Sequence, residues 1–400
     1  MVRQTLFSRW FALVFFAALA SELSNALLVH FPGFLLDLGA SESGIGAIVG
    51  VAGVAAIAAR PFIGRVMDRR SRRLLVRVGT LTVVMATLGY AFVDTLGPMV
   101  ITARLLQGLG QAMTMTAFWA HIADRIPAER RAQGIALFGI SGLAPIGVAP
   151  ALGDAILGTE WGYQGLFVVA AAFSLAAFGL SMLMEPGRPE GGESPTGFVS
   201  VLRTKELQPV WLATVALSLG FTTAFIFVKT YAATSGLGSI GPFFAAYSVA
   251  AVSWRLGLGW VPDRVGPVRM VAPSLVLYAT GLATIGLVPG FGGLIAGGAL
   301  TGLGHGIGYP VMLTLATARA NVNVRGTVTA LFIAVFDLVL FAIPPLIGLT
   351  IELAGYPPMF VGVAGLVIVG MLAFYAMERR RHLRSPSLRD EPATAPIPYV

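Results

Sequence analysis

The sequence predicts an all-α integral membrane protein in which twelve transmembrane helices form two six-helix bundles. Three observations lead to this prediction: the composition, a series of long apolar stretches, and the placement of the basic residues. Of the 400 residues, 56% are hydrophobic and only 12% are charged, whereas soluble domains contain about 25% charged residues. A chain of this composition lacks the polar side chains that would cover a large surface facing water.

Twelve stretches are long and apolar enough to cross a membrane, which requires about 20 residues each. The Gly- and Pro-rich stretch 132–156 is included because helix bundles in membranes tolerate both residues. The first stretch has the basic start of a signal peptide, but its length and the second stretch directly after it predict a retained helix. The runs do not alternate with a period of two residues, which argues against a β-barrel. The expected spans are residues 10–32, 44–66, 77–94, 97–119, 132–156, 164–184, 208–233, 241–261, 270–289, 293–317, 327–351 and 357–377.

The basic residues fall almost entirely on one side of the predicted membrane. With a cytoplasmic N-terminus, 23 of the 27 Lys and Arg residues lie in cytoplasmic segments, and the other four lie within spans. This distribution follows the positive-inside rule, and it supports the helix count because one missed helix would invert every later loop. We therefore expect a multi-pass protein of the cell membrane (plasma or inner) with both termini in the cytoplasm. The net charge of +8 is then a topology signal and does not indicate nucleic-acid binding.

The chain repeats itself at an offset of 193 to 195 residues. A register that is kept across half of the chain indicates two copies of a six-helix unit, which is one architecture of transporters. The predicted organisation is an N-terminal bundle (1–184), a cytoplasmic linker rich in Gly, Pro and charges (185–207), a C-terminal bundle (208–378) and a disordered tail (379–400). The matching pairs include Arg60 with Arg255, Gly64 with Gly259, Asp68 with Asp263, Arg69 with Arg264, Arg125 with Arg319, and Pro150 with Pro345.

Two motifs in this arrangement resemble the major facilitator superfamily of secondary transporters. The loop between spans two and three has the family's form G-x-x-x-D-R-x-x-R-R/K, and span four contains R-x-x-Q-G-x-G. The resemblance covers nearly the whole chain except the tail, and it implies the fold of that family and transport by alternating access. The residues that carry it are Gly64, Asp68, Arg69, Arg72 and Arg73 in the loop, and Arg104, Gln107, Gly108 and Gly110 in span four.

The resemblance implies that the loop motif acts as a cytoplasmic latch. Asp68 would face the N-terminus of helix eleven, whose partial positive charge favours a carboxylate, and the arginines would pair with Asp124 or Glu129. Such contacts exist only when the cytoplasmic side is closed, so they would favour the outward-facing state. The alternative is that the loop is basic for topology alone. Ala318 replaces Asp124 in the second half, which predicts a weaker second latch. The expected latch residues are Gly64, Asp68, Arg69, Arg72, Arg73, Asp124, Gly259, Asp263 and Arg264.

Five ionisable residues lie near mid-depth or in the outer half of a span, and a charge at the bilayer centre costs roughly 2.5–3.5 kcal/mol and therefore indicates a role. In the resembling family, helices one, four, seven and ten line the central cavity, and each of these helices carries one such residue here. The carboxylates are expected to bind and release protons, and the basic residues to contact substrate or balance charge. The alternatives are a structural hydrogen bond, snorkelling to the interface and packing. The substrate and proton pathway is predicted to contain Glu22, Arg104, Lys229, His305 and Asp337.

Other charged residues near span ends are expected to have simpler surroundings. His30 and Asp37 lie near the predicted outer mouth and should face water. Arg60 and Arg255 lie near the cytoplasmic ends and should snorkel or join the basic hairpins. Asp154 lies near the outer end of span five, where it is either a point of proton entry or a solvated helix terminus.

Span five resembles in part the antiporter motif of the family, G-x-x-x-G-P-x-x-G-G, as "PIGVAPALGD" at 145–154. The partial match favours export, and import of a small polar or anionic solute is the alternative. Proline lacks an amide donor and glycine permits close packing, so both tighten or bend this helix. The expected helix-packing residues are Gln107, Gly108, Pro150 and Gly153.

The sequence excludes several other classes of protein. Cysteine is absent, so a disulfide framework and Cys-based metal sites are excluded, and no nucleotide-binding or hydrolase motif occurs. We expect no catalytic residues, no metal and no cofactor. Energy would come from an ion gradient or from the solute's own gradient, with protons as the expected ion. The expected partners are a small-molecule substrate, protons and the lipid bilayer, with the chain acting as a monomer. A non-transporting membrane receptor or sensor on the same scaffold is the alternative of another class.

Overall fold

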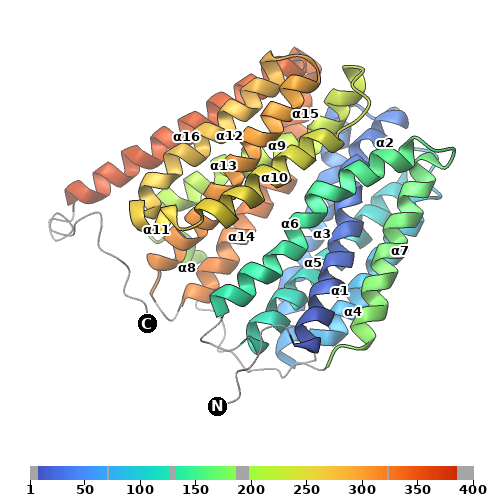
Figure 1. The fold of residues 1–400 in the computed structure, drawn as a ribbon, viewed down its shortest axis with the longest axis horizontal. Coiled ribbons are helices and arrows are strands. Elements are labelled where there is room, and N and C mark those ends of the chain that lie inside the picture. The colour runs from blue at the N-terminus through green and yellow to red at the C-terminus, as the bar shows by residue number, and fades with distance from the viewer. Residues whose placement is uncertain (1–7, 70–71, 127–130, 186–197, 322–323, 385–400) are drawn as a thin grey trace. The chain divides into compact units, whose positions relative to one another are not determined.

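The computed structural model describes residues 8–69, 72–126, 131–185, 198–321 and 324–384. Within these residues every regular element is a helix (Figure 1), as predicted. The first half contains α1 (Arg9–Leu27), η1 (Leu28–His30), α2 (Phe31–Asp37), α3 (Glu42–Arg69), α4 (Arg72–Tyr90), α5 (Pro98–Arg125), α6 (Arg131–Leu157) and α7 (Gly162–Met182). The remainder contains α8 (Phe198–Leu202), α9 (Gln208–Thr234), α10 (Gly241–Leu258), α11 (Val261–Val265), α12 (Pro267–Leu287), α13 (Gly290–Ala318), α14 (Arg325–Ala342), α15 (Pro344–Ala354) and α16 (Tyr356–Arg384).

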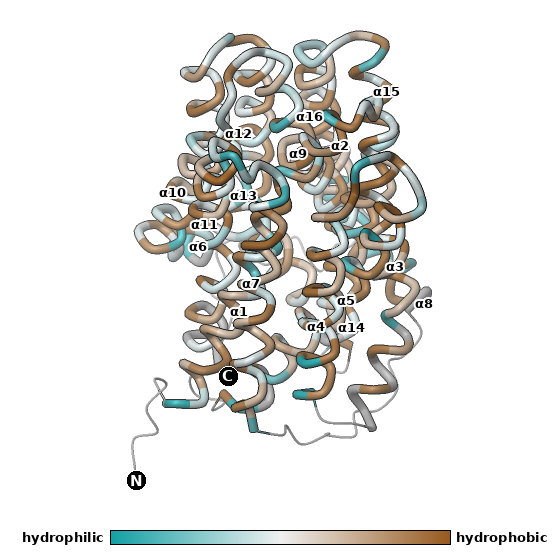
Figure 2. Tube along the Cα trace, turned by 90° about the vertical axis from the view of Figure 1, so that its right-hand side faces the viewer, coloured by the Kyte–Doolittle hydropathy of each residue, from teal (hydrophilic) through white to brown (hydrophobic). Residues whose placement is uncertain are grey.

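The long helices account for the twelve predicted spans. In the described part of the chain, nine helical stretches are long and apolar enough to cross a membrane by length and composition alone. Two of them combine shorter helices, namely Arg9–Asp37 and Thr327–Ala354. The three further long helices are α5, α10 and α13, which contain polar residues or many glycines. Hydrophobic and neutral residues cover most of each helix (Figure 2).

Prolines divide two of the spans that were predicted as continuous. The eleventh span was expected at 327–351, but α14 ends at Ala342 and α15 begins at Pro344. Pro344 and Pro345 have no amide donor, so the hydrogen-bond ladder cannot run through them. The first span continues past residue 32 through the 3₁₀ turn η1 and the Pro32-containing α2 to Asp37.

The linker and the tail contain helix where the structure describes them. The short helix α8 lies within the predicted linker 185–207, and α16 continues to Arg384 into the predicted tail. The rest of that tail, residues 385–400, lies outside the described residues. The predicted linker and the first residues of the predicted tail therefore contain helix that their composition does not indicate.

Contacts divide the chain into two compact units. Unit 1 is Met1–Glu193 with Ala232–Phe244, and unit 2 is Ser194–Tyr231 with Ala245–Val400. Within unit 1, α4 packs on α5 and α7, α3 packs on α5, and α1 packs on α6 and α7 (Figure 1). Within unit 2, α12 packs on α13 and α16. The α12 contacts repeat those of α4, as the sequence repeat requires.

The repeat extends to the closest helix approaches. A Cβ atom at Gly108 of α5 would overlap the backbone of Ala52 in α3, and one at Gly302 of α13 would overlap the backbone of Tyr247 in α10. The two contacts are related by the offsets 194 and 195, so the duplicated glycines hold the same place in both units. Small residues let membrane helices approach closely. A second matching pair of contacts joins Gly110 to Gly79 and Gly304 to Ser274. A Cβ at Gly110 would lie 2.7 Å from the Gly79 carbonyl oxygen, and a Cβ at Gly304 would lie 2.7 Å from the Ser274 carbonyl oxygen.

We expect Gly108→Ala and Gly302→Ala each to destabilise the protein by about 1–3 kcal/mol, because neither backbone contact has room for a methyl group. Thermal unfolding of the detergent-solubilised protein measures the effect. Gly179→Ala in α7 is the matched control, since a Cβ there meets nothing within 4 Å. Equal stability of the three variants would show that these helix approaches are not tight.

Candidate functional site

A ladder of polar side chains joins α1 to α5 inside unit 1. Arg104 is 8% exposed; its Nη1 donates to Gln107 Oε1, and its Nε and Nη2 donate to the Val49 carbonyl at 3.4 and 3.3 Å. Its guanidinium also lies 4.9 Å from the centre of the Phe31 ring, a favourable cation–π geometry. Gln107 Nε2 continues the ladder to Asn25 Oδ1 at 3.2 Å. Neutral acceptors thus hold the buried guanidinium.

Glu22 stands beside this ladder and has a neutral donor as its partner. Gln111 Nε2 donates to Glu22 Oε1 at 2.8 Å, and both side chains are half-buried. Glu22 is the fourteenth residue of the 29-residue stretch Arg9–Asp37, so it lies near the middle of the span. An amide can donate to a carboxylate or to the carbonyl of a protonated carboxyl group. The contact with Gln111 therefore persists in either protonation state of Glu22.

Helical spacing explains why these side chains meet. Arg104, Gln107 and Gln111 lie at positions i, i+3 and i+7 of α5, and Glu22 and Asn25 lie at i and i+3 of α1. Such positions share one face of a helix. Each helix therefore presents a polar stripe, and packing of the helices brings the two stripes together. The sequence shows both stripes, but it does not show that Gln111 is the partner of Glu22.

In unit 2, His305 lies inside a cluster of aromatic rings. Its ring centroid is 5.2 Å from that of Phe221, 5.8 Å from Tyr247 and 5.5 Å from Tyr309. Three helices each contribute a pair of these residues at i and i+4, which places the pair on one face. The pairs are Phe221 and Phe225 in α9, His305 and Tyr309 in α13, and Phe332 and Phe336 in α14.

The other predicted pathway residues of unit 2 have different surroundings. Asp337 of α14 is half-buried and acts electrostatically on Tyr309, next to His305. Lys229 of α9 is 7% exposed. Arg255, which was expected to snorkel or to join a hairpin, is half-buried and lies near enough to Tyr309 and His305 to act on them electrostatically.

The expected latch lies only in part within the described residues. Side chains outside them are those of Gly64, Asp68, Arg69, Asp124 and Asp263. Among the described residues, Arg72 is buried, and Arg264 lies over the Trp260 ring at 4.4 Å. Gly259 is exposed, and a Cβ added to it would lie close to the Arg255 carbonyl oxygen.

Arg73 and the neighbouring Arg77 bind the end of α7. Arg73 Nη1 donates to the Met184 carbonyl at 3.0 Å, and Arg77 Nη2 donates to the Met182 carbonyl at 2.9 Å. The last carbonyls of a helix lack intrahelical donors and carry partial negative charge, which favours cations. These two arginines therefore tie α4 to α7 within unit 1.

The repeat also duplicates an ion pair that sequence reasoning missed. Arg125 Nη1 lies 3.0 Å from Glu185 Oε2 in unit 1, and Arg319 binds both carboxylate oxygens of Glu378 at 2.7 Å in unit 2. The offsets are 194 for the arginines and 193 for the glutamates. The first pair is largely exposed, whereas the side chains of the second are 8% and 4% exposed. Burial lowers the pKa of Arg319, and the hydrogen bonds to Glu378 oppose this shift. The matching glutamates were a signal in the sequence.

The surroundings of His30 differ from the prediction that this side chain faces water. The His30 side chain is fully buried, its Nε2 lies 3.0 Å from the Pro150 carbonyl oxygen, and its ring occupies the space beside Gly153. Its Nδ1 lies 3.8 Å from Asp154 Oδ1. The packing residues Pro150 and Gly153 of α6 therefore receive a side chain from η1. The extension of the first span through η1, which the apolar pattern did not reveal, is the reason for this burial.

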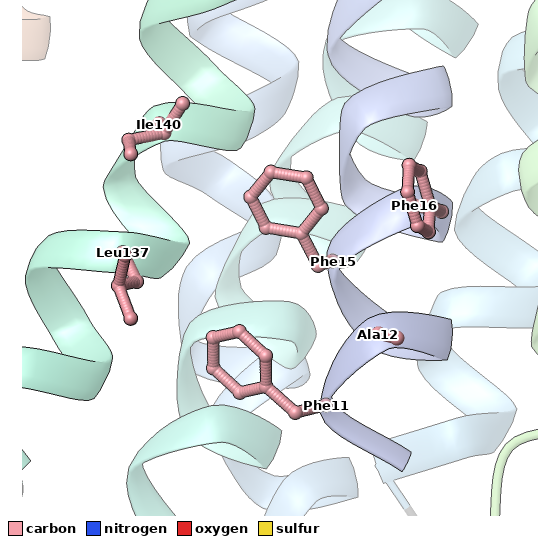
Figure 3. A pocket seen from close by; sticks show the side chains of 6 residues that line it. All are labelled: Phe11, Ala12, Phe15, Phe16, Leu137 and Ile140. Carbon is pink, nitrogen blue, oxygen red and sulfur yellow. The ribbon is translucent and has the colours of Figure 1, made fainter. Parts of the chain in front are cut away.

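An apolar cavity of about 330 Å³ lies between α1 and α6 and contains none of the polar candidates. Figure 3 shows the rings of Phe11 and Phe15 from α1 directed toward the α6 side chains. Among the described residues, no cluster of three or more His, Cys, Asp or Glu side chains could hold a metal ion. The cavity is lined by Phe11, Ala12, Phe15, Phe16, Leu137 and Ile140.

We expect Glu378→Gln to destabilise the protein strongly, by roughly 3–5 kcal/mol, because it leaves the buried Arg319 without its carboxylate. Glu185→Gln is the matched control from the other repeat. It should cost at most about 1 kcal/mol, because that pair is exposed. Thermal unfolding of both variants in detergent measures the difference, and equal losses would contradict the assigned burial.

Comparisons with known proteins agree with this architecture. The family model "Major Facilitator Superfamily" matches residues 10–270 and 211–398. The staphylopine export protein of Staphylococcus aureus is 25% identical over 90% of this chain and 92% of its own length. The uncharacterised MFS-type transporter YhhS of Salmonella typhimurium is 26% identical over 94% and 93% of the two chains.

Solved structures show the same fold at low sequence identity. A POT family transporter in complex with 5-aminolevulinic acid has a TM-score of 0.79 at 12% identity, with 93% of this chain and 96% of that chain covered. A bacterial homologue of the human lysosomal transporter Spinster has a TM-score of 0.75 at 13% identity, with 94% and 98% covered. The repeated six-helix units, the duplicated glycine contacts and the family match lead to one conclusion: this chain belongs to the Major Facilitator Superfamily and is a multi-pass membrane transporter.

Proposed function

We propose that this secondary transporter exports a small solute in exchange for protons. The observation that carries the proposal is the contact between Glu22 and Gln111 near the middle of the first span. A carboxylate in this position is costly unless it is paired, protonated or part of an ion pathway. Its described partner is a neutral amide, and the nearby Arg104 directs its donors to Gln107 and Val49 instead. Glu22 can therefore change its charge without breaking an ion pair.

Two sequence features support the outward direction of transport. One relative that aligns along nearly the whole chain is named for export, the staphylopine export protein. The Pro- and Gly-containing segment 145–154 also resembles in part the antiporter motif. Arg104 and Lys229 are the proposed substrate or charge-balancing contacts, and Asp337 is a further candidate for proton binding beside Glu22. The proposed orientation has both termini in the cytoplasm, from the placement of the arginines.

Glu22→Gln should abolish flux driven by a pH gradient, because glutamine cannot bind and release the proton, whereas exchange of substrate for substrate should survive. A thermal-shift screen of the purified protein against metabolites and drugs first identifies a substrate. Flux is then measured in proteoliposomes with and without an imposed pH gradient. Glu160→Gln, which removes an exposed carboxylate, is the control. Identical dependence of flux on the gradient in parent and Glu22→Gln would remove Glu22 from the proton pathway.

The proposed latch of the loop between α3 and α4 predicts that Asp68→Asn inserts normally but transports at a small fraction of the parent rate. The carboxylate would no longer stabilise the state that is closed on the cytoplasmic side. Membrane insertion is measured by protein yield from washed membranes, and transport by the same flux assay. Asp94→Asn, in an exposed loop, controls for the loss of one negative charge. Unchanged flux in Asp68→Asn would leave the loop with its topological role alone.

A further inference from the structure

Two buried nitrogen atoms at the aromatic cluster of unit 2 have no hydrogen-bond partner among the described residues. They are Nδ1 of His305 in α13 and Nε of Arg255 in α10. The Nε of an arginine is always a donor, and a histidine nitrogen donates in the tautomer that carries the proton there. Buried polar groups in proteins nearly always have a partner. Both atoms are therefore available to an acceptor on a bound molecule.

Glycines of α13 bring α10 to this place. A Cβ at Gly302 would overlap the backbone of Tyr247, and a Cβ at Gly306 would lie 2.9 Å from the Cα of Ala251. This close approach lets the Tyr247 ring lie on the His305 ring, with centroids 5.8 Å apart and planes 26° from parallel. Arg255 follows Ala251 by one turn and lies on the same face of α10.

The rings of the cluster differ in their exposure. His305 is only 8% exposed, whereas Phe221 and Phe225 of α9 and Tyr309 of α13 are half-buried. The centroids of Phe221 and Tyr309 lie 5.2 and 5.5 Å from that of His305. Partly exposed ring faces therefore lie next to a buried donor. Such faces favour a flat ring of a ligand, which can stack on them or meet them edge-on.

The charges around the cluster favour a ligand with one negative charge. Arg255 lies near enough to His305 and Tyr309 to act on them electrostatically, and Asp337 acts on Tyr309. Lys229 follows Phe225 by one turn on the same face of α9. These two cations and one carboxylate sum to a charge of +1. A guanidinium group pairs well with a carboxylate because its planar N–H groups match the two oxygens.

We propose that the aromatic cluster of unit 2 binds a small aromatic carboxylate, with Nδ1 of His305 and Nε of Arg255 as donors to its oxygens and Phe221 against its ring. With the proposed export of a small solute as the premise, an aromatic monocarboxylate is the chemical class of that solute. Carboxylic acids of this class are ionised near neutral pH. The binding energy then comes from charge-assisted hydrogen bonds at one end and ring contacts at the other.

Three probes of similar shape separate these two contributions. 2-Naphthoate has the carboxylate and the flat ring, 2-naphthamide has the ring without the charge, and decahydro-2-naphthoate has the charge without the aromatic faces. Binding to the purified full-length protein is measured by isothermal titration calorimetry at neutral pH. We expect 2-naphthoate to bind about tenfold or more tightly than the amide, and about two- to tenfold more tightly than the saturated acid.

Variants locate the site within unit 2. Arg255→Gln and His305→Phe should each weaken 2-naphthoate about tenfold and leave binding of the amide nearly unchanged, because the phenyl ring keeps the stacking of residue 305. Phe221→Leu should remove the preference for the aromatic acid over the saturated acid. The matched controls Arg203→Gln and Phe291→Leu change exposed side chains of the same unit and should bind as the parent does.

Thermal unfolding without a probe checks that each variant is folded, and the three-probe comparison in the parent needs no variant. A parent that binds the amide or the saturated acid as tightly as 2-naphthoate would overturn the proposal. So would parent affinity in Arg255→Gln, above all if Arg104→Gln loses binding, because the carboxylate would then belong to Arg104. Binding is measured without a gradient. Failed proton-coupled flux with intact binding would therefore contradict export alone, whereas failed discrimination among the probes would contradict this site alone.

Discussion

Lipid offers no hydrogen bonds, so each polar group inside the membrane needs a partner from the protein itself. The helices satisfy this requirement for the backbone, and the polar ladder satisfies it for side chains. Arg104 is held by Gln107, the Val49 carbonyl and the Phe31 ring, all of which are neutral. A charge that is solvated by neutral groups keeps its field for a substrate or an ion, whereas a salt bridge would cancel it. The same constraint gives Glu22 a neutral amide as its partner.

The helices inside each unit pack in the same way, but the side chains next to these helix contacts differ between the units. The duplicated glycines Gly108 and Gly302 bring corresponding helices together in both units. Next to these contacts, unit 1 carries charged and amide side chains, whereas unit 2 carries aromatic rings around His305. The glycine contacts are thus common to both units, whereas the side chains next to them are not.

The two ion pairs occupy matching positions in the repeat but differ in burial. Arg319 and Glu378 are buried and bidentate, whereas Arg125 and Glu185 are largely exposed. Charge-assisted bidentate pairs are strong and geometrically specific, so the second unit gains rigidity at the helix ends where the first relies on Arg73 and Arg77 at the end of α7.

The sequence by itself determined the helical membrane fold, the number of spans, the duplication and the polar stripes of α1 and α5, because each of these depends on composition and on the periodicity of single helices. It did not determine which stripes meet. Only the tertiary structure decided that Gln111 binds Glu22, that Arg255 lies near the aromatic cluster, and that His30 is buried against Asp154. Such pairs join helices that are far apart in the chain, and their identity depends on helix rotation and on a 3₁₀ turn that hydropathy does not encode.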